Sequence, residues 1–212
     1  MSITFLLKNK ILPLTGLIGL CLVLSSGTAT AGQQEHDPHA HHKMMMKQTG
    51  YKSSIHHYTI PDLVVIDMNN NKVSLPEALG DDGPVILNFI FTTCTTICPV
   101  LSATFSQVQR ELGDEAKNLR MISITIDPEQ DTPERLKEYA ARFKAGADWH
   151  FLTGSIENII ATQKAFDAYR GDKMNHIPLT FVRSTADGQW LRLEGFTSAA
   201  EVVAEYRQIL AQ

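Results

Sequence analysis

The chain has 212 residues, of which 43% are hydrophobic, and a formal net charge of −4. This length is enough for one domain with a sizeable buried core, which needs no disulfide staple. The 19 Lys and Arg residues are outnumbered by 23 Asp and Glu and form no basic run, so we expect no nucleic-acid partner.

The first 31 residues are expected to be an export signal. Lys8 and Lys10 form a short positive region, and Ile11 to Leu24 is an apolar stretch. Ala29-Thr30-Ala31 has the small-residue pattern of a signal peptidase site. A helix over the apolar stretch would be about 21 Å long, which is short of the ~30 Å hydrocarbon core of a bilayer. We therefore prefer cleavage at this site to an uncleaved membrane anchor.

Cleavage would change the number of cysteines. Cys21 also suggests a lipoprotein, but Leu20 precedes it where lipoprotein peptidases require a small residue. Removing 31 of 212 residues leaves 181, with Cys94 and Cys98 as the remaining cysteines, and takes the formal net charge from −4 to −6. We expect this exported protein in the bacterial periplasm, where a pair of cysteines tends to form a disulfide.

Residues 32–57 are predicted to be a flexible arm, because they hold few large apolar residues and no sustained period. The arm is nevertheless rich in imidazole and thioether groups, which bind copper, and thioether favours Cu(I). We expect an auxiliary metal site here; the alternative is a solvated linker with accidental histidines. The candidate ligands are His36, His39, His41, His42, Met44, Met45 and Met46.

A globular pattern begins at residue 58. Residues 59–75 predict two short strands joined at a turn over Asn69–Asn71, and residues 76–79 predict one helical turn. Residues 85–91 are a continuous apolar run, which is typical of a central strand buried on both faces.

Helices and strands then alternate to the end of the chain. Pro133 is expected at the first position of a helix, with Asp131 or Thr132 as its N-cap. This order predicts an α/β domain over residues 58–212, with a mixed central sheet and helices on both faces. In order, we expect a helix at 99–112, a strand at 119–126, the helix from 133, a strand or loop at 149–154, a helix at 155–169, a strand at 177–182, its hairpin partner at 189–196 and a helix at 198–210.

Cys94 and Cys98 lie between the central strand and the next helix, where open α/β sheets bind ligands. Cys98 is at the helix start, whose free N–H groups and dipole lower the pKa of a thiol. We therefore expect at least one reactive thiol. The pair could be a disulfide switch, a metal clamp or a structural staple, but so short a loop makes a poor staple.

The spacing of the two cysteines bears on this choice. Residues four apart on a helix have Cβ atoms ~5–6 Å apart, whereas a disulfide requires about 4 Å. A metal with bonds of about 2.3 Å to each sulfur spans a wider gap. The spacing therefore favours metal binding without excluding the disulfide, and we expect both states.

A third ligand could come from His150 or His176. His176 precedes the strand at 177–182. If that strand is antiparallel to the central strand, as the late hairpin favours, then His176 lies beside the cysteines; if it is parallel, His176 lies at the opposite end. The alternative for His176 is a structural histidine, and we expect His150 to be a packing residue.

Four stretches form a distinctive series: FTTCTTICPV, ITIDPEQDTPERLKEYA, WHFLTG and HIPLTFV followed by DG. Together they resemble the Sco family, also called SenC, over about residues 58–212. The resemblance implies a thioredoxin-like fold with an added N-terminal β-hairpin, and copper ligation, as Cu(I) or Cu(II), by Cys94, Cys98 and His176. Thr95 and Thr96 depart from the Pro and Asp that many members carry there.

The resemblance implies a copper metallochaperone that assists assembly of a CuA centre, of cytochrome c oxidase in the first instance. Its partners would be the CuA-containing subunit, a copper donor protein and a thiol–disulfide reductant, close to a membrane. The second hypothesis is a redox-active thiol–disulfide reductase, with Cys94 and Cys98 as its catalytic residues. A peroxiredoxin-like peroxidase is a third hypothesis, but the segment supplies no evident peroxide site.

Overall fold

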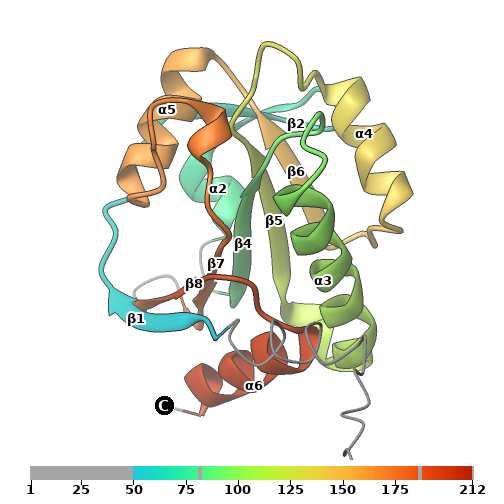
Figure 1. The fold of residues 1–212 in the computed structure, drawn as a ribbon, viewed down its shortest axis with the longest axis vertical. Coiled ribbons are helices and arrows are strands. Elements are labelled where there is room, and N and C mark those ends of the chain that lie inside the picture. Colours follow the sequence, from blue (N-terminus) through green and yellow to red (C-terminus); the bar gives the residue numbers. More distant parts are fainter. Residues whose placement is uncertain (1–49, 81–82, 186–187, 212) are drawn as a thin grey trace, which may run out of the picture. The chain divides into compact units, whose positions relative to one another are not determined.

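The computed structural model describes residues 50–80, 83–185 and 188–211 (Figure 1). The strands in this part of the chain form one mixed sheet in the order β1-β8-β7-β4-β5-β6-β2-β3. They are β1 (Lys52–His56), β2 (Val64–Asp67), β3 (Lys72–Ser74), β4 (Val85–Ile90), β5 (Arg120–Thr125), β6 (Trp149–Thr153), β7 (Leu179–Arg183) and β8 (Trp190–Glu194).

Helices pack on both faces of this sheet, as predicted. They are α2 (Leu75–Leu79), α3 (Ile97–Leu112), α4 (Pro133–Arg142), α5 (Ile156–Ala165) and α6 (Ala199–Leu210), with 3₁₀ turns η1 (Gly113–Asn118) and η2 (Lys173–Asn175). Phe105, Leu136 and Val202 bring α3, α4 and α6 into one hydrophobic core. Leu79 and Ile159 bring α2 and α5 into a second core. None of the helices in the described ranges is long and apolar enough to cross a membrane.

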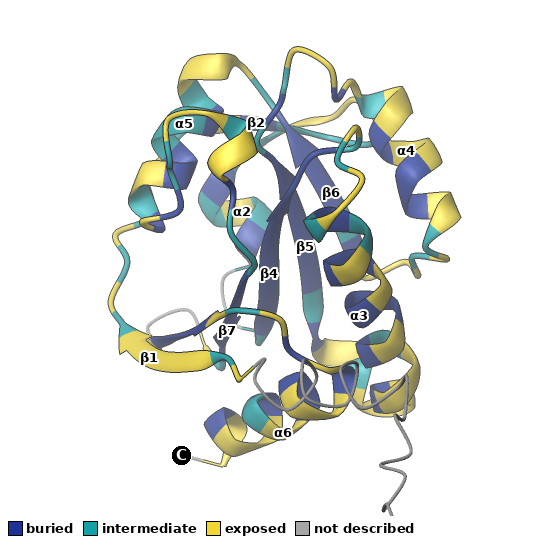
Figure 2. Ribbon diagram, in the orientation of Figure 1, coloured by how far each residue is buried: buried dark blue, intermediate teal, exposed yellow. Residues whose placement is uncertain are grey.

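Strand β4 lies at the centre of the sheet, as its continuous apolar run predicts. All six of its residues are buried (Figure 2). It pairs with β5 in parallel and with β7 antiparallel. Because β7 runs against β4, the loop that enters β7 lies at the same edge of the sheet as the loop that leaves β4.

The predicted N-terminal hairpin is present as β2 and β3. Its turn at Asn69–Asn71 is closed by the Asp67 carboxylate, which accepts the backbone N–H groups of Asn69 and Asn71 at 2.8 Å. The hairpin extends the sheet, because β2 pairs antiparallel with β6.

The predicted boundary of the arm needs correction at its C-terminal end. Lys52–His56 is strand β1, which pairs antiparallel with β8, with Ile55 opposite Leu191. Strand β1 is the outermost strand of the sheet and is largely exposed. Because its residues are mostly polar, the sequence pattern did not indicate a strand. The proposed arm ligands at 36–46 and the export signal lie outside the described residues.

Helix α5 is shorter than predicted, because it ends at Ala165 and not at Tyr169. Asp167 adopts a positive φ of 49°, and the N–H of Ala168 turns back to the carbonyl of Gln163 at 2.7 Å. The residues after this turn form the loop that leads to His176.

Candidate metal centre

Cys94 lies in the turn between β4 and α3, with its N–H donating to the carbonyl of Phe91 at 3.1 Å. Helix α3 begins at Ile97, and the side chain of its N-cap, Thr96, makes no capping hydrogen bond. The Cys94 sulfur takes that role, since it accepts the N–H of Cys98 at 3.4 Å. The four-residue helical spacing assumed from the sequence is therefore wrong: Cys94 is not on the helix.

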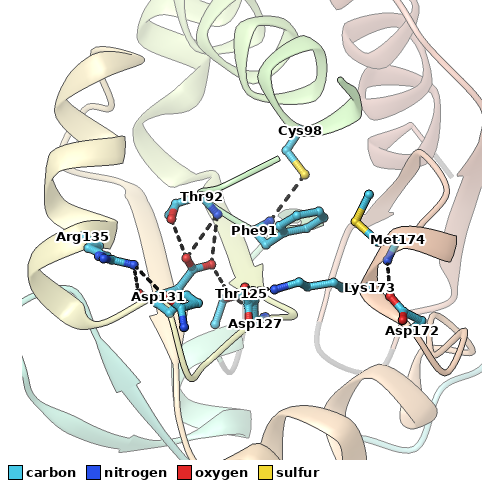
Figure 3. Close-up of polar contacts among 11 residues, drawn as sticks. Phe91, Thr92, Cys98, Thr125, Asp127, Asp131, Arg135, Asp172, Lys173 and Met174 are labelled. Atoms are coloured by element: carbon cyan, nitrogen blue, oxygen red, sulfur yellow. Dashed lines mark hydrogen bonds and ion pairs between the residues drawn. The ribbon is translucent and has the colours of Figure 1, made fainter. Parts of the chain in front are cut away.

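Cys98 lies in the first turn of α3 and is fully buried. Its sulfur accepts the backbone N–H of Phe91 at 3.4 Å (Figure 3). Both cysteines carry free thiols, so the structure shows the reduced state of the pair.

The two thiols differ in acidity. Burial raises the pKa of Cys94, but hydrogen bonds from the backbone N–H groups of Cys98 and Thr96 outweigh it and lower the pKa overall. Burial raises the pKa of Cys98 far above its usual range. The helix start therefore stabilises a thiolate on Cys94, and the expectation that Cys98 would gain from it is wrong.

His176 lies at the same edge of the sheet as the cysteines, as the antiparallel pairing of β7 predicts. It lines a cavity of about 180 Å³ together with Cys94 and Phe91. His176 is 8% exposed, and among the described residues its Nε2 atom has no hydrogen-bond partner. Burial lowers the pKa of His176 to about 4. The result is a neutral imidazole with an unpartnered ring nitrogen, which is the form that binds metals.

Cys94 and His176 line this cavity, whereas Cys98 lies buried in the first turn of α3. Within the described ranges, no three His, Cys, Asp or Glu side chains are placed to hold one metal ion. The structure thus brings Cys94 and Cys98 together and sets His176 beside them, and a three-ligand site requires these side chains to move closer.

His150 lies elsewhere, near the start of β6 and opposite Ile122 of β5. It lines a separate cavity with Asp67 and Arg120, and burial lowers its pKa. Its position gives it no part in a site with the cysteines.

Asp131 supports the cysteine turn, a role that the sequence did not reveal. Its fully buried carboxylate accepts the N–H of Thr92 at 3.1 and 3.2 Å and the hydroxyl groups of Thr92 and Thr125 (Figure 3). The N-cap of α4 is Thr132, whose side chain accepts the N–H of Arg135. Asp131 is therefore free to anchor the residue that begins the cysteine turn.

A second support, also missed, holds the turn before His176. Lys173 of η2 forms an ion pair with Asp127, whose carboxylate is buried in the loop after β5. The Lys173 ammonium also lies 5.7 Å from the centroid of the Phe91 ring, and this ring meets His176 edge-on at 6.3 Å. The sequence signal that could have indicated both supports is the Asp-Pro-Glu-x-Asp-Thr-Pro run, because it contains Asp127 and Asp131.

The sequence model of the SCO1/SenC family matches residues 53–211. This chain belongs to the SCO1/SenC family. A SCO1 protein homolog of Bacillus subtilis is 36% identical over 104 residues, which are 49% of this chain and 53% of that protein. The chain thus spans about half the length of that curated relative.

Solved Sco structures match over more of the chain. BsSco, described as a member of the Sco family of cytochrome c oxidase assembly proteins with a disulfide switch, is 28% identical, has a TM-score of 0.62 and covers 74% of this chain and 96% of its own. Bradyrhizobium japonicum ScoI with copper bound is 25% identical and has a TM-score of 0.57. The match covers 69% of this chain and 96% of that protein's chain. These neighbours confirm the predicted α/β, thioredoxin-like fold.

Proposed function

We propose that this Sco protein is an exported copper metallochaperone that binds copper through Cys94, Cys98 and His176 and assists assembly of a CuA centre. The observation that carries the proposal is the buried, unpartnered Nε2 atom of His176 in the cavity that Cys94 also lines. A buried polar atom without a partner is costly, and a metal ion would supply the missing bond.

The donor set suits copper as a cargo. Thiolate sulfur favours Cu(I), and imidazole suits copper in either oxidation state. His176 is already neutral and Cys94 is the more acidic thiol. The main free-energy cost of binding copper is therefore the deprotonation of Cys98. Because Cys94 is half-exposed and Cys98 is buried, a partner's ligands would reach the ion from the Cys94 side.

The proposed partners are a copper donor protein, the CuA-containing subunit of cytochrome c oxidase and a thiol–disulfide reductant, near a membrane in the periplasm. Support comes from BsSco, which belongs to a family of cytochrome c oxidase assembly proteins, and from the copper-bound Bradyrhizobium japonicum ScoI. The His/Met-rich arm at 36–46 is proposed as an auxiliary copper site.

A thiol–disulfide reductase is the second candidate, favoured by the contrast between the two thiols. The Cys94 thiolate would attack a target disulfide and form a mixed disulfide. Cys98 would then attack Cys94, and its proton would pass to the departing target thiolate. The first target thiolate takes its proton from solvent. The target thus gains two electrons and leaves as a dithiol, while this chain loses two electrons and is left with a Cys94–Cys98 disulfide until the reductant reduces it.

The substitution His176→Ala separates the two functions. We expect Cu(I) affinity to fall at least tenfold, about 1.4 kcal/mol, because one of three ligands is lost. The rate of exchange with a small disulfide should stay within about threefold, since that reaction needs only the thiols. Anaerobic competition with a chromophoric chelator measures the affinity. His150→Ala is the matched control and should leave both quantities unchanged; Cu(I) affinity retained by His176→Ala would rule out the three-ligand site.

A further inference from the structure

Met174 is an exposed thioether beside the candidate metal centre. Its side chain is 75% exposed, whereas the other exposed large hydrophobic side chains in the described ranges lie between 38% and 50%. Methionine is ordinarily used to fill irregular gaps in cores. Its exposure here has no packing explanation.

The backbone that carries Met174 is held in place. The N–H of Met174 donates to the carboxylate of Asp172 at 2.8 Å, and the N–H of His176 closes the turn on the carbonyl of Lys173 at 3.1 Å. The ion pair of Lys173 with Asp127 fixes this turn to the loop after β5 (Figure 3). The backbone of Met174 is therefore held at a defined place.

That place is the cavity of the candidate metal centre. Met174 lines the same 180 Å³ cavity as Cys94 and His176. His176 is more than nine-tenths buried, and its Nε2 atom, which lacks a partner, supplies an independent sign that a ligand belongs there. Thiolate, thioether and imidazole groups thus surround one small space.

We propose that the Met174 thioether is a further Cu(I) contact of this site. Together with Cys94, the thioether would hold the Cu(I) ion while the ion enters and leaves the site. The inference rests on the proposed copper-binding function. An ion from solvent meets the exposed Met174 and the half-exposed Cys94 before it reaches the buried Cys98 and His176. A thioether is neutral and soft, so it binds Cu(I) in preference to Cu(II).

The test uses the full-length, reduced chain in which Met44, Met45 and Met46 are changed to Leu, so that the arm supplies no thioether. In this background Met174→Leu keeps the apolar volume and removes the sulfur. We expect Cu(I) affinity to fall at least about threefold, with Cu(II) affinity unchanged. In protein labelled with ¹³C at the methionine methyl groups, the Met174 resonance should shift on addition of one equivalent of Cu(I).

The methyl resonances of Met68 and Met121 serve as internal controls, since neither residue lines the cavity. An unmoved Met174 resonance together with unchanged Cu(I) affinity would overturn the inference and leave the three-ligand site standing. Equal losses of Cu(I) and Cu(II) affinity would overturn it too, because they would indicate a structural role. A parent chain that binds no Cu(I) would instead refute the proposed function, and the inference with it.

Discussion

Cys94 and Cys98 differ in exposure and in acidity. Cys94 is half-exposed, and its sulfur accepts the N–H of Cys98 in the first turn of α3, whereas Cys98 itself is fully buried. The reactive form of a thiol is the thiolate, so in the proposed reductase Cys94 would be the attacking thiol and Cys98 the resolving one. The sequence indicated a reactive pair, but it could not say which thiol would react.

Alkylation of the reduced protein with iodoacetamide at neutral pH tests this difference. We expect Cys94 to be modified at least about tenfold faster than Cys98, because its thiolate is favoured and accessible. Mass spectrometry of the two sites over time measures the rates. In urea the two rates should converge, and equal rates in the folded protein would contradict the assignment.

At the scale of elements, the site is assembled by loops that meet at one edge of the sheet. The loop after β4 carries Cys94 and leads into α3, which carries Cys98 in its first turn. The loop after β5 carries Asp127 and Asp131, and the loop before β7 carries His176. The order of β4, β5 and β7 in the sheet makes these loops neighbours. Asp131 joins the first two through Thr92, and Asp127 joins the second to the third through Lys173.

Asp131→Ala should destabilise both the fold and the site. It leaves the N–H of Thr92 and the hydroxyl groups of Thr92 and Thr125 without their acceptor, and we expect a loss of about 3 kcal/mol in the free energy of unfolding. Urea denaturation measures it. Asp114→Ala is the matched control, because Asp114 is exposed and forms a surface ion pair with Lys117; its effect should stay within about 0.5 kcal/mol.

Should Asp131→Ala fail to fold, Asp131→Asn keeps the shape and one acceptor oxygen and should show a smaller loss. Wild-type stability in either variant would show that the buried carboxylate does not support the cysteine turn.

At the scale of the whole molecule, folding buries His176 of the loop before β7, where its ring meets the ring of Phe91. Burial lowers its pKa from 6.5 to about 4, so the folded chain takes up this proton less readily than the unfolded chain. The resulting contribution to stability is complete above pH 6.5 and is lost as the pH falls from 6.5 towards 4.

The free energy of unfolding of the metal-free protein should therefore fall by up to about 3 kcal/mol over this range through His176 alone. Urea denaturation between pH 7 and pH 4 measures the total fall, to which carboxylates also contribute. His176→Leu removes the histidine share, so its curve should be flatter than that of the wild type. Parallel curves for the two proteins would contradict the buried, neutral imidazole.

Local patterns of the sequence were enough to predict much of this molecule. The apolar run of β4, the Thr132-Pro133 start of α4 and the hairpin turn at Asn69–Asn71 are confirmed, because each depends on neighbours in the chain. The pairing of β7 with β4 was also inferred, and it placed His176 beside the cysteines. Strand β1 was missed, because an exposed edge strand needs no apolar alternation.

The amino-acid pattern was enough to predict the α/β fold, the family and the candidate ligands Cys94, Cys98 and His176. The folded chain was needed to show which thiol is acidic, what holds the cysteine turn and where Met174 lies. Thiol acidity depends on burial and on donated N–H groups, and the supports join residues 39 and 46 positions apart. Such contacts exist only after the sheet has brought the loops to one edge.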